Sequence, residues 1–269
     1  MEKRIHLSCT LALTLCLLLS VTQGYAQDTD KEFTPRSGQA GKDVVWVPTP
    51  QALVDTMLAM ANVTAADYVI DLGSGDGRLV ITAAKRGATA LGIEYNPNMV
   101  ELATRNAREE GVSAKATFRQ ADIFESDFSK ATVITLFLLT DLNLKLRPQL
   151  LEMKPGTRIV SNTFNMNDWE PDQTVKLDEY TSWSTAHLWI VPAKVDGTWK
   201  LDGGQIKFVQ KFQHFTGTLT MGDKEMELSG KLNGDKISFN AGGTEYTGTV
   251  NGNAISGTIA GGGSWNATR

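Results

Sequence analysis

The chain between about residues 44 and 193 alternates short apolar runs with longer amphipathic segments. Apolar runs rich in valine, isoleucine and leucine are typical of buried strands, and the amphipathic segments have the periodicity of helices. The strands we expect are Tyr68–Asp71, Ala90–Glu94, Lys115–Gln120, Thr132–Phe137 and Arg158–Asn162, and two of the helices between them are Asn98–Glu110 and Leu142–Met153. This order predicts an α/β fold with a mostly parallel sheet and helices on both faces.

Two further strand-like runs end this part of the chain. Thr174–Tyr180 and Ser184–Val191 follow each other without a helical segment between them. Strands connected this closely pair antiparallel, because a parallel connection needs a longer crossover. We therefore expect a hairpin at one edge of the sheet.

From Gly197 onward, glycine, threonine and short alternating strands replace the helical pattern. The triplets Leu228-Ser229-Gly230, Ile237-Ser238-Phe239, Tyr246-Thr247-Gly248 and Ile255-Ser256-Gly257 recur at nine residues, with Asn-Gly pairs at Asn233-Gly234 and Asn251-Gly252. Such spacing predicts successive hairpins of a small all-β meander, either a barrel or a sandwich. We place the boundary near Val195, which gives one domain over residues 44–194 and a second, of unknown role, over residues 195–269.

The first 26 residues have the layout of a secretory signal peptide. Lys3 and Arg4 precede an apolar run from Leu11 to Val21, and Gly24-Tyr25-Ala26 supplies a small-residue cleavage site. The sequence therefore predicts export to the periplasm or beyond, a flexible linker over residues 27–43, and no stable membrane span after processing. The alternative is a retained membrane anchor, although the apolar run is short for that purpose.

The charge and the cysteine content of the chain argue against some classes of ligand and partner. The formal net charge of the 269-residue chain is −4, and no basic cluster is present, which argues against a nucleic acid partner. Both cysteines, Cys9 and Cys16, lie inside the predicted signal peptide. No metal-ligand spacing occurs, so we expect neither disulfide nor metal chemistry in the mature protein.

The stretch VIDLGSGDGR at residues 69–78 is the most informative motif. A dinucleotide fingerprint needs a third glycine where Arg78 stands, and no lysine occupies the place that a Walker loop requires. What remains is an acid followed by alternating glycines, formed by Asp71, Gly73, Ser74, Gly75 and Gly77. Such a loop suits a small zwitterionic ligand, because glycines allow close approach and the acid accepts from an ammonium group.

Two more acids follow the next two predicted strands. Glu94 can accept both hydroxyl groups of a ribose. Asp122 can accept from an adenine amino group while Ile123 or Phe124 covers the ring. Each acid alone could be a helix cap, a solvated loop residue or the start of a turn. Together with the glycine loop, they predict a nucleoside-type cofactor site.

With these residues, the sequence over roughly Val44 to Ala193 resembles the class I S-adenosylmethionine-dependent methyltransferases. More narrowly, VIDLGSGDGR, GIE, VPTP and the run TLFLLTDLNLKLRPQLLEMKPGTRIVSNTFNMNDWEPD resemble the mitochondrial protein-lysine methyltransferases that act on ATP synthase c subunits and the adenine nucleotide translocase, together with their bacterial relatives. The resemblance implies a Rossmann-like seven-stranded sheet with a reversed last strand and S-adenosyl-L-methionine as cofactor. It also implies that Thr49, with Trp46 and Pro48, closes over the cofactor.

Methyl transfer needs a well-placed acceptor and a route for its proton. Acceptors are expected outside the carboxyl ends of the strands, which makes Asp141, Asn143 and Asn162 the catalytic candidates. Asp141 could instead cap the helix beginning at Leu142, and the two asparagines could merely satisfy loop backbone. His187 lies in an alternating edge strand, so we interpret it as structural.

The resulting hypothesis is an exported methyltransferase that acts on a protein amine such as lysine. One alternative is a small-molecule methyltransferase, because the acceptor pocket cannot be read from the sequence. A second is a non-catalytic exported protein that binds a nucleoside-type ligand. The sequence does not determine the oligomeric state.

We expect the mature protein to begin at Gln27, because the signal peptidase cleaves after a small residue that follows a short apolar core. N-terminal sequencing and intact-mass measurement of the protein purified from its producing cells would show this. An intact Met1 in the membrane fraction would favour the membrane anchor instead.

Overall fold

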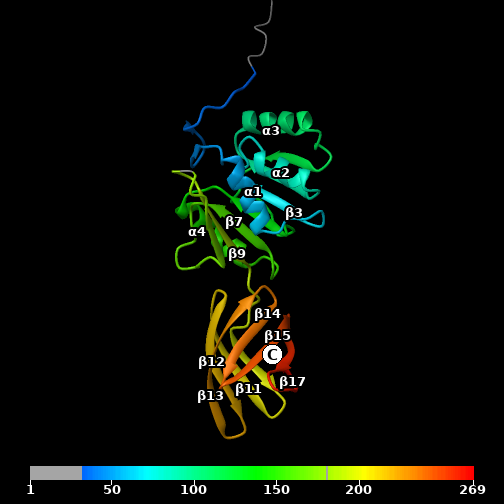
Figure 1. The fold of residues 1–269 in the computed structure, drawn as a ribbon, viewed down its shortest axis with the longest axis vertical. Coiled ribbons are helices and arrows are strands. Elements are labelled where there is room, and N and C mark those ends of the chain that lie inside the picture. Colours follow the sequence, from blue (N-terminus) through cyan, green and yellow to red (C-terminus); the bar gives the residue numbers. More distant parts are fainter. Residues whose placement is uncertain (1–31, 180) are drawn as a thin grey trace, which may run out of the picture. The chain divides into compact units, whose positions relative to one another are not determined.

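A computed structural model describes residues 32–179 and 181–269 (Figure 1). The predicted signal peptide and the first part of the predicted linker lie outside the described residues. Within the described ranges, every helix is too short or too polar to cross a membrane.

The N-terminal part of the described chain contains a seven-stranded sheet with the strand order β5-β4-β3-β6-β7-β9-β8. Its members are β3 (Tyr68–Leu72), β4 (Thr89–Glu94), β5 (Ala116–Gln120), β6 (Val133–Leu136), β7 (Arg158–Asn162), β8 (Gln173–Lys176) and β9 (Thr185–Ile190). Strands β3 to β7 pair in parallel, whereas β9 pairs antiparallel with both β7 and β8. The sheet is therefore that of a class I methyltransferase, with the reversed strand β9 next to the edge.

Helices cover both faces of this sheet. Side chains of α1 (Gln51–Met60), α2 (Arg78–Lys85) and α3 (Pro97–Glu109) share one buried cluster with one face of the strands, and those of α4 (Thr140–Leu151) share a second cluster with the other. Neighbouring residues of a strand point to opposite faces, so Val69 joins the first cluster and Ile70 the second. Burial on both faces explains why the strands are apolar without alternation.

The predicted parallel strands and the edge hairpin are confirmed, with small shifts at their ends. One alternative is excluded: α4 begins at Thr140 with Leu139 at the N-cap, so Asp141 lies inside the first turn and does not cap the helix. An acid in the first turn still interacts favourably with the helix dipole. The edge strand β8 is also shorter than predicted and ends at Lys176.

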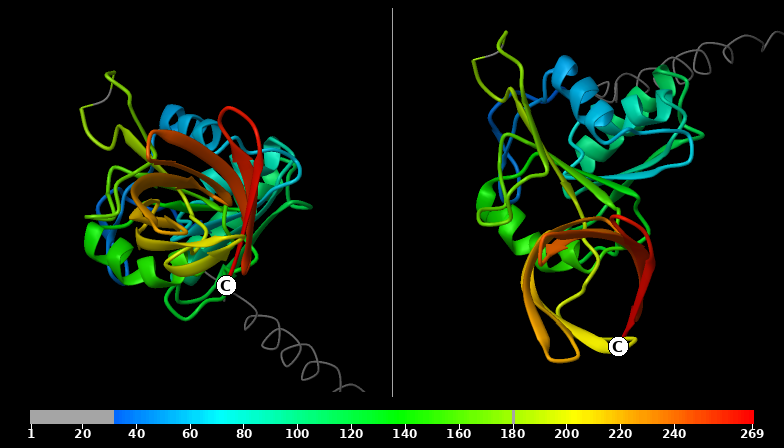
Figure 2. Two further views of the ribbon diagram at one scale, coloured as in Figure 1. Left: turned by 90° about the horizontal axis from the view of Figure 1, so that it is seen from below. Right: turned by 60° about the horizontal axis from the view of Figure 1, so that its bottom comes forward.

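The C-terminal strands form a closed antiparallel barrel, which settles the choice between barrel and sandwich (Figure 2). They are β10 (Gly197–Leu201), β11 (Gly204–Lys211), β12 (His214–Met221), β13 (Lys224–Asn233), β14 (Lys236–Ala241), β15 (Thr244–Asn251), β16 (Ala254–Ile259) and β17 (Ser264–Thr268). Strand β17 pairs with β10 and closes the ring, so no strand edge of the barrel is left open. The division of the chain into two domains near Val195 stays a prediction.

The nine-residue repeat places one triplet on each strand from β13 to β16. The central Ser or Thr of each triplet is exposed, and the flanking apolar residues point into the barrel. The hairpin turns differ by one residue from the expected Asn-Gly pairs. Asn233 still pairs with Lys236, so Gly234 and Asp235 form the loop, and Gly234 adopts a left-handed φ of 60°. That conformation is typical of a turn with glycine first.

Glycines inside the barrel make room for aromatic rings. A side chain at Gly257 would meet Trp265 Nε1 at 2.5 Å and the carbonyl oxygen of Thr247 at 1.9 Å. Trp265 lies across the wall at this point and donates from Nε1 to that same carbonyl at 3.0 Å. The glycine of the repeat is therefore needed where the indole lies flat against the strands.

We expect Gly257→Val to destabilise the barrel by about 1–3 kcal/mol or more, because the added side chain collides with the carbonyl oxygen of Thr247 and with Trp265. The neighbouring Ser256 is exposed, so Ser256→Val is the matched control and should cost little. Urea unfolding followed by tryptophan fluorescence measures both free energies of unfolding. Equal stability of the two variants would show that the contact with Trp265 is not limiting.

Candidate functional site

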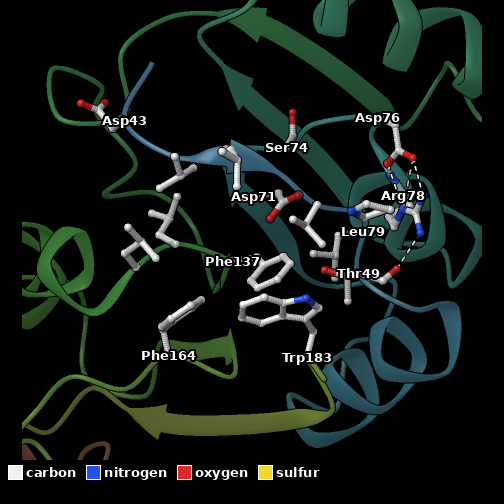
Figure 3. A pocket seen from close by; sticks show the side chains of 17 residues that line it. Asp43, Thr49, Asp71, Ser74, Asp76, Arg78, Leu79, Phe137, Phe164 and Trp183 are labelled. Carbon is white, nitrogen blue, oxygen red and sulfur yellow. Dashed lines mark hydrogen bonds and ion pairs between the residues drawn. The ribbon is translucent and has the colours of Figure 1, made fainter. Parts of the chain in front are cut away.

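Two adjoining cavities open at the carboxyl ends of β3, β4 and β6. The larger has a volume of about 330 Å³ and the smaller about 90 Å³. Both are lined by Gly73 of the glycine loop, by Asp43 and Val44 of the segment before β2 (Val45–Trp46), and by Phe137 and Leu138 after β6. The larger volume falls in the range of small-molecule sites. Figure 3 shows the larger cavity.

Asp71 is the next-to-last residue of β3 and lines the larger cavity, with only 3 % of its surface exposed. Its carboxylate accepts a 2.6 Å hydrogen bond from Thr135 Oγ1 on the neighbouring strand β6. Burial raises the pKa of Asp71 to about 7, the bond from Thr135 opposes this shift, and the nearby Glu94 and Asp76 add to it. A carboxylate in this state is stabilised by a cation that enters the cavity.

The three glycines of the loop between β3 and α2 are needed for different structural reasons. Gly73 lines both cavities, as expected for a residue that a ligand approaches. A side chain at Gly75 would instead meet Trp46 Nε1 at 2.6 Å, so this glycine makes room for the indole that lies over the loop. Gly77 is the N-cap of α2, with a left-handed φ of 84°, and packs against Phe118.

The smaller cavity carries the other two predicted acids, Glu94 and Asp122. Glu94 accepts from the backbone N–H of Gly75 at 3.0 Å through one carboxylate oxygen and from that of Asn96 at 2.9 Å through the other. Each oxygen keeps a further lone pair, which a diol can use. The backbone of the glycine loop therefore orients the Glu94 carboxylate.

Asp122 binds a side chain that sequence reasoning missed. Lys42 Nζ forms an ion pair with the Asp122 carboxylate and lies over the Tyr95 ring, 4.9 Å from its centroid. The hydrogen bond from Lys42 lowers the pKa of Asp122 below its usual value. Each oxygen of Asp122 keeps a further lone pair for an adenine amino group, because Lys42 bonds to one and the backbone N–H of Phe124 to the other. Ile123 also lines the smaller cavity and can cover a ring there.

Thr49 and Ser74 lie at the larger cavity but differ in orientation. Thr49 is buried, accepts a 3.2 Å hydrogen bond from Asn162 Nδ2, and its backbone carbonyl accepts from Arg78 at 2.6 Å. Ser74 directs its hydroxyl away from Asp71 (Figure 3). That hydroxyl is buried without a hydrogen-bond partner among the described residues, and it lies over Gly92.

The three catalytic candidates lie beside the cavities and do not line them. Asp141 is exposed on α4. Asn143 is fully buried and donates from Nδ2 to the carbonyl oxygens of Phe164 at 3.1 Å and Asn165 at 3.3 Å. Asn162 accepts from Thr163 Oγ1 at 2.8 Å and donates to Thr49. Both asparagines therefore organise backbone and side chains around the site, and direct participation in the reaction stays a prediction.

His187 of β9 belongs to the same polar network. Its two ring nitrogens lie 2.9 Å from Thr174 Oγ1 and 3.2 Å from the carbonyl oxygen of Thr163. Burial lowers the pKa of His187. The described residues contain no group of three or more His, Cys, Asp or Glu side chains that could hold a metal ion.

The chain is similar to known methyltransferases over this part of its length. The model of the ANTKMT methyltransferase domain matches residues 71–173. A protein-lysine N-methyltransferase of Saccharolobus islandicus is 42% identical over 151 residues, which cover 55% of this chain and 94% of that protein. The chain belongs to the methyltransferase family of this Saccharolobus islandicus protein.

Two further relatives extend the comparison. The human lysine N-methyltransferase named for the ATP synthase c subunit is 32% identical over 140 residues, which cover 52% of this chain and 60% of the human protein. A solved structure of an RNA methyltransferase from Salinibacter ruber in complex with S-adenosyl-L-homocysteine is 48% identical, with a TM-score of 0.53, and covers 55% of this chain and 96% of that one.

The protein is therefore an S-adenosylmethionine-dependent methyltransferase, and S-adenosylmethionine is its cofactor. The residues present fit this molecule. The buried carboxylate of Asp71 faces a cavity and suits the ammonium group, Glu94 has free lone pairs for the ribose, and Asp122 already binds an ammonium where an adenine amino group is expected. The pairing of each acid with one part of the cofactor stays a prediction.

We expect the affinity for S-adenosylmethionine to fall as the pH is lowered from about 7.5 to about 5.5. The raised pKa means that Asp71 takes up a proton near pH 7, and the ammonium of the cofactor pairs only with the ionised form. Binding therefore releases a proton below pH 7, and the affinity can fall by up to about tenfold per pH unit. Calorimetric titration in buffers of different ionisation enthalpy measures both effects.

Asp71→Asn keeps an acceptor for Thr135 and should bind more weakly with a flatter pH profile. Asp223→Asn, in an exposed hairpin turn, should keep the wild-type profile. A wild-type pH dependence in Asp71→Asn would show that another group controls the titration.

Proposed function

We propose that the protein transfers the methyl group of S-adenosylmethionine to the side-chain amine of lysine in a protein. The observation that carries this proposal is the larger cavity itself. Its lining combines polar side chains, among them Asp71 and Thr49, with the three aromatic side chains of Phe137, Phe164 and Trp183. A lysine side chain, which has a long apolar stem and an amine at its tip, fits such a lining.

The names of two relatives support the same substrate class. The protein from Saccharolobus islandicus is a protein-lysine N-methyltransferase, and the human protein is a lysine N-methyltransferase named for the ATP synthase c subunit. The chain covers nearly all of the first relative but only 60% of the second. The identity of the acceptor protein is not inferred from either.

The residues of the chain have mainly to align the reactants and exclude water. Bound S-adenosylmethionine supplies a methyl group on a sulfonium, which is a good leaving group. Asp71, oriented by Thr135, would hold the ammonium group of the cofactor near the end of β3, and Asn162 fixes Thr49 at the cavity. The three aromatic side chains exclude water from the acceptor, which lowers the pKa of an amine and increases its nucleophilic neutral fraction.

RNA is the second candidate acceptor, because the relative of known structure from Salinibacter ruber is described as an RNA methyltransferase. Aromatic rings can also stack on an unpaired base. The net charge of −4 and the absence of a basic cluster in the sequence disfavour this candidate, since nucleic acid affinity depends strongly on phosphate contacts. We therefore argue for the protein amine.

We expect the purified protein to transfer a labelled methyl group to unstructured lysine-containing polypeptides and not to single-stranded RNA. Mass spectrometry of the digested polypeptide should locate the label on lysine side chains. Glu94→Ala serves as the control, because losing the ribose acceptor should weaken cofactor binding by about 1–3 kcal/mol. Label found only in RNA would replace the proposal with the second candidate.

A further inference from the structure

Three aromatic side chains from separate elements meet at one side of the larger cavity. Phe137 follows β6, Phe164 follows β7, and Trp183 lies on the connection between β8 and β9. The ring centroids are 5.5 Å apart for Phe137 and Trp183, 5.7 Å for Phe164 and Trp183, and 6.2 Å for the two phenylalanines. Figure 3 shows the rings side by side below Asp71. We refer to them as the aromatic wall.

Trp183 is held in a conformation that costs energy. Its φ is +54°, a region that a bulky side chain rarely adopts, and 37 % of its surface is exposed. An exposed tryptophan in a strained conformation gains little from core burial. Strain of this kind is concentrated at ligand sites, where the surrounding structure holds it. The indole is therefore placed for contact with a ligand.

The turn that carries Phe164 is strained as well and is held by buried polar groups. Thr163 has a φ of +62°. The carbonyl oxygen of Phe164 accepts from Ser161 Oγ at 2.7 Å and from Asn143 Nδ2 at 3.1 Å, while His187 lies 3.2 Å from the carbonyl oxygen of Thr163. Two strained backbone positions thus present two of the three rings to the same cavity.

The chemistry of the wall distinguishes between amines that carry different numbers of methyl groups. The faces of aromatic rings attract cations, and this attraction is the usual basis for recognition of methylated ammonium groups. An unmodified ammonium is compact and strongly hydrated, so it loses more on transfer to such a surface. The carboxylates that line the cavity, Asp43, Asp71 and Asp76, come from other elements than the three rings.

We propose that Trp183, together with Phe137 and Phe164, is the specificity-determining surface for the acceptor, and that it favours lysine side chains already carrying one or two methyl groups. This inference rests on the proposed function. Each transfer forms one N–C bond, breaks the C–S bond of the sulfonium and releases one proton from the acceptor amine to water. A wall that retains the methylated product in the site therefore promotes the second and third transfers.

The test uses three synthetic peptides of the same sequence, with one lysine that is unmodified, monomethylated or dimethylated. The kcat/KM value for each is measured with the wild-type protein and with Trp183→Ala, Trp183→Leu and Trp183→Phe. Leucine keeps apolar surface without a π face, and phenylalanine keeps the π face. Calorimetric titration with S-adenosylmethionine shows that each variant is folded and binds its cofactor.

We expect Trp183→Ala and Trp183→Leu to lower kcat/KM for the dimethylated peptide by about three- to tenfold more than for the unmodified one. Monomethyllysine should then accumulate with the unmodified peptide, and Trp183→Phe should restore most of the preference. Equal losses on all three peptides, or none, would overturn the inference alone. A wild-type protein that binds S-adenosylmethionine but methylates none of the peptides would overturn the proposed function and this inference with it.

Discussion

The hydrogen bond between Asp71 and Thr135 lies at the point where the strand order of the sheet reverses. β3 and β6 are neighbours there, and the chain continues from β3 toward one edge and from β6 toward the other. Crevices for ligands open outside the carboxyl ends of strands at such a point. The bond orients the Asp71 carboxylate in this crevice and partly offsets the rise in its pKa that burial causes, so the free protein holds an acid that a cationic ligand can stabilise.

The acceptor side of the site depends on a different constraint, the shape of the turn after β7. Asn143 and Asn162 are both fully buried, and their amide groups bond to this turn and to Thr49. The amide nitrogens of both asparagines are paired in this network, whereas Asn143 Oδ1 is buried without a hydrogen-bond partner among the described residues. It follows that a substitution in the network changes the position of Phe164 before it changes any reacting group.

The strand-end acids could be predicted from sequence because parallel strands bring their carboxyl ends to one edge of a sheet. Glu94 and Asp122 therefore lie together in the smaller cavity as expected. Contacts between distant segments carry no such signal. Nothing near Asp122 in the sequence indicates that Lys42 pairs with it, and the glycine pattern does not show that Gly75 makes room for Trp46.

Local helix signals were also insufficient where packing decides the boundary. Asp141 fits an N-cap by residue type, yet α4 begins at Thr140, two residues before the expected start at Leu142, with Leu139 at the cap position. Trp183 was missed for a related reason. Its role follows from a left-handed backbone and from rings contributed by two other connections, and neither has a local sequence pattern.

The cofactor and the acceptor that we propose for the larger cavity impose opposite requirements on charge. The cofactor brings a cation that needs Asp71 ionised, whereas the acceptor amine has to lose its proton before it can attack. A free carboxylate beside the amine would keep it protonated and slow the reaction. Asp71 is already bonded to Thr135, and we expect it to pair with the ammonium of the bound cofactor. The acceptor then meets mainly aromatic surface, which favours the neutral amine as nucleophile and attracts the methylated cation that forms from it.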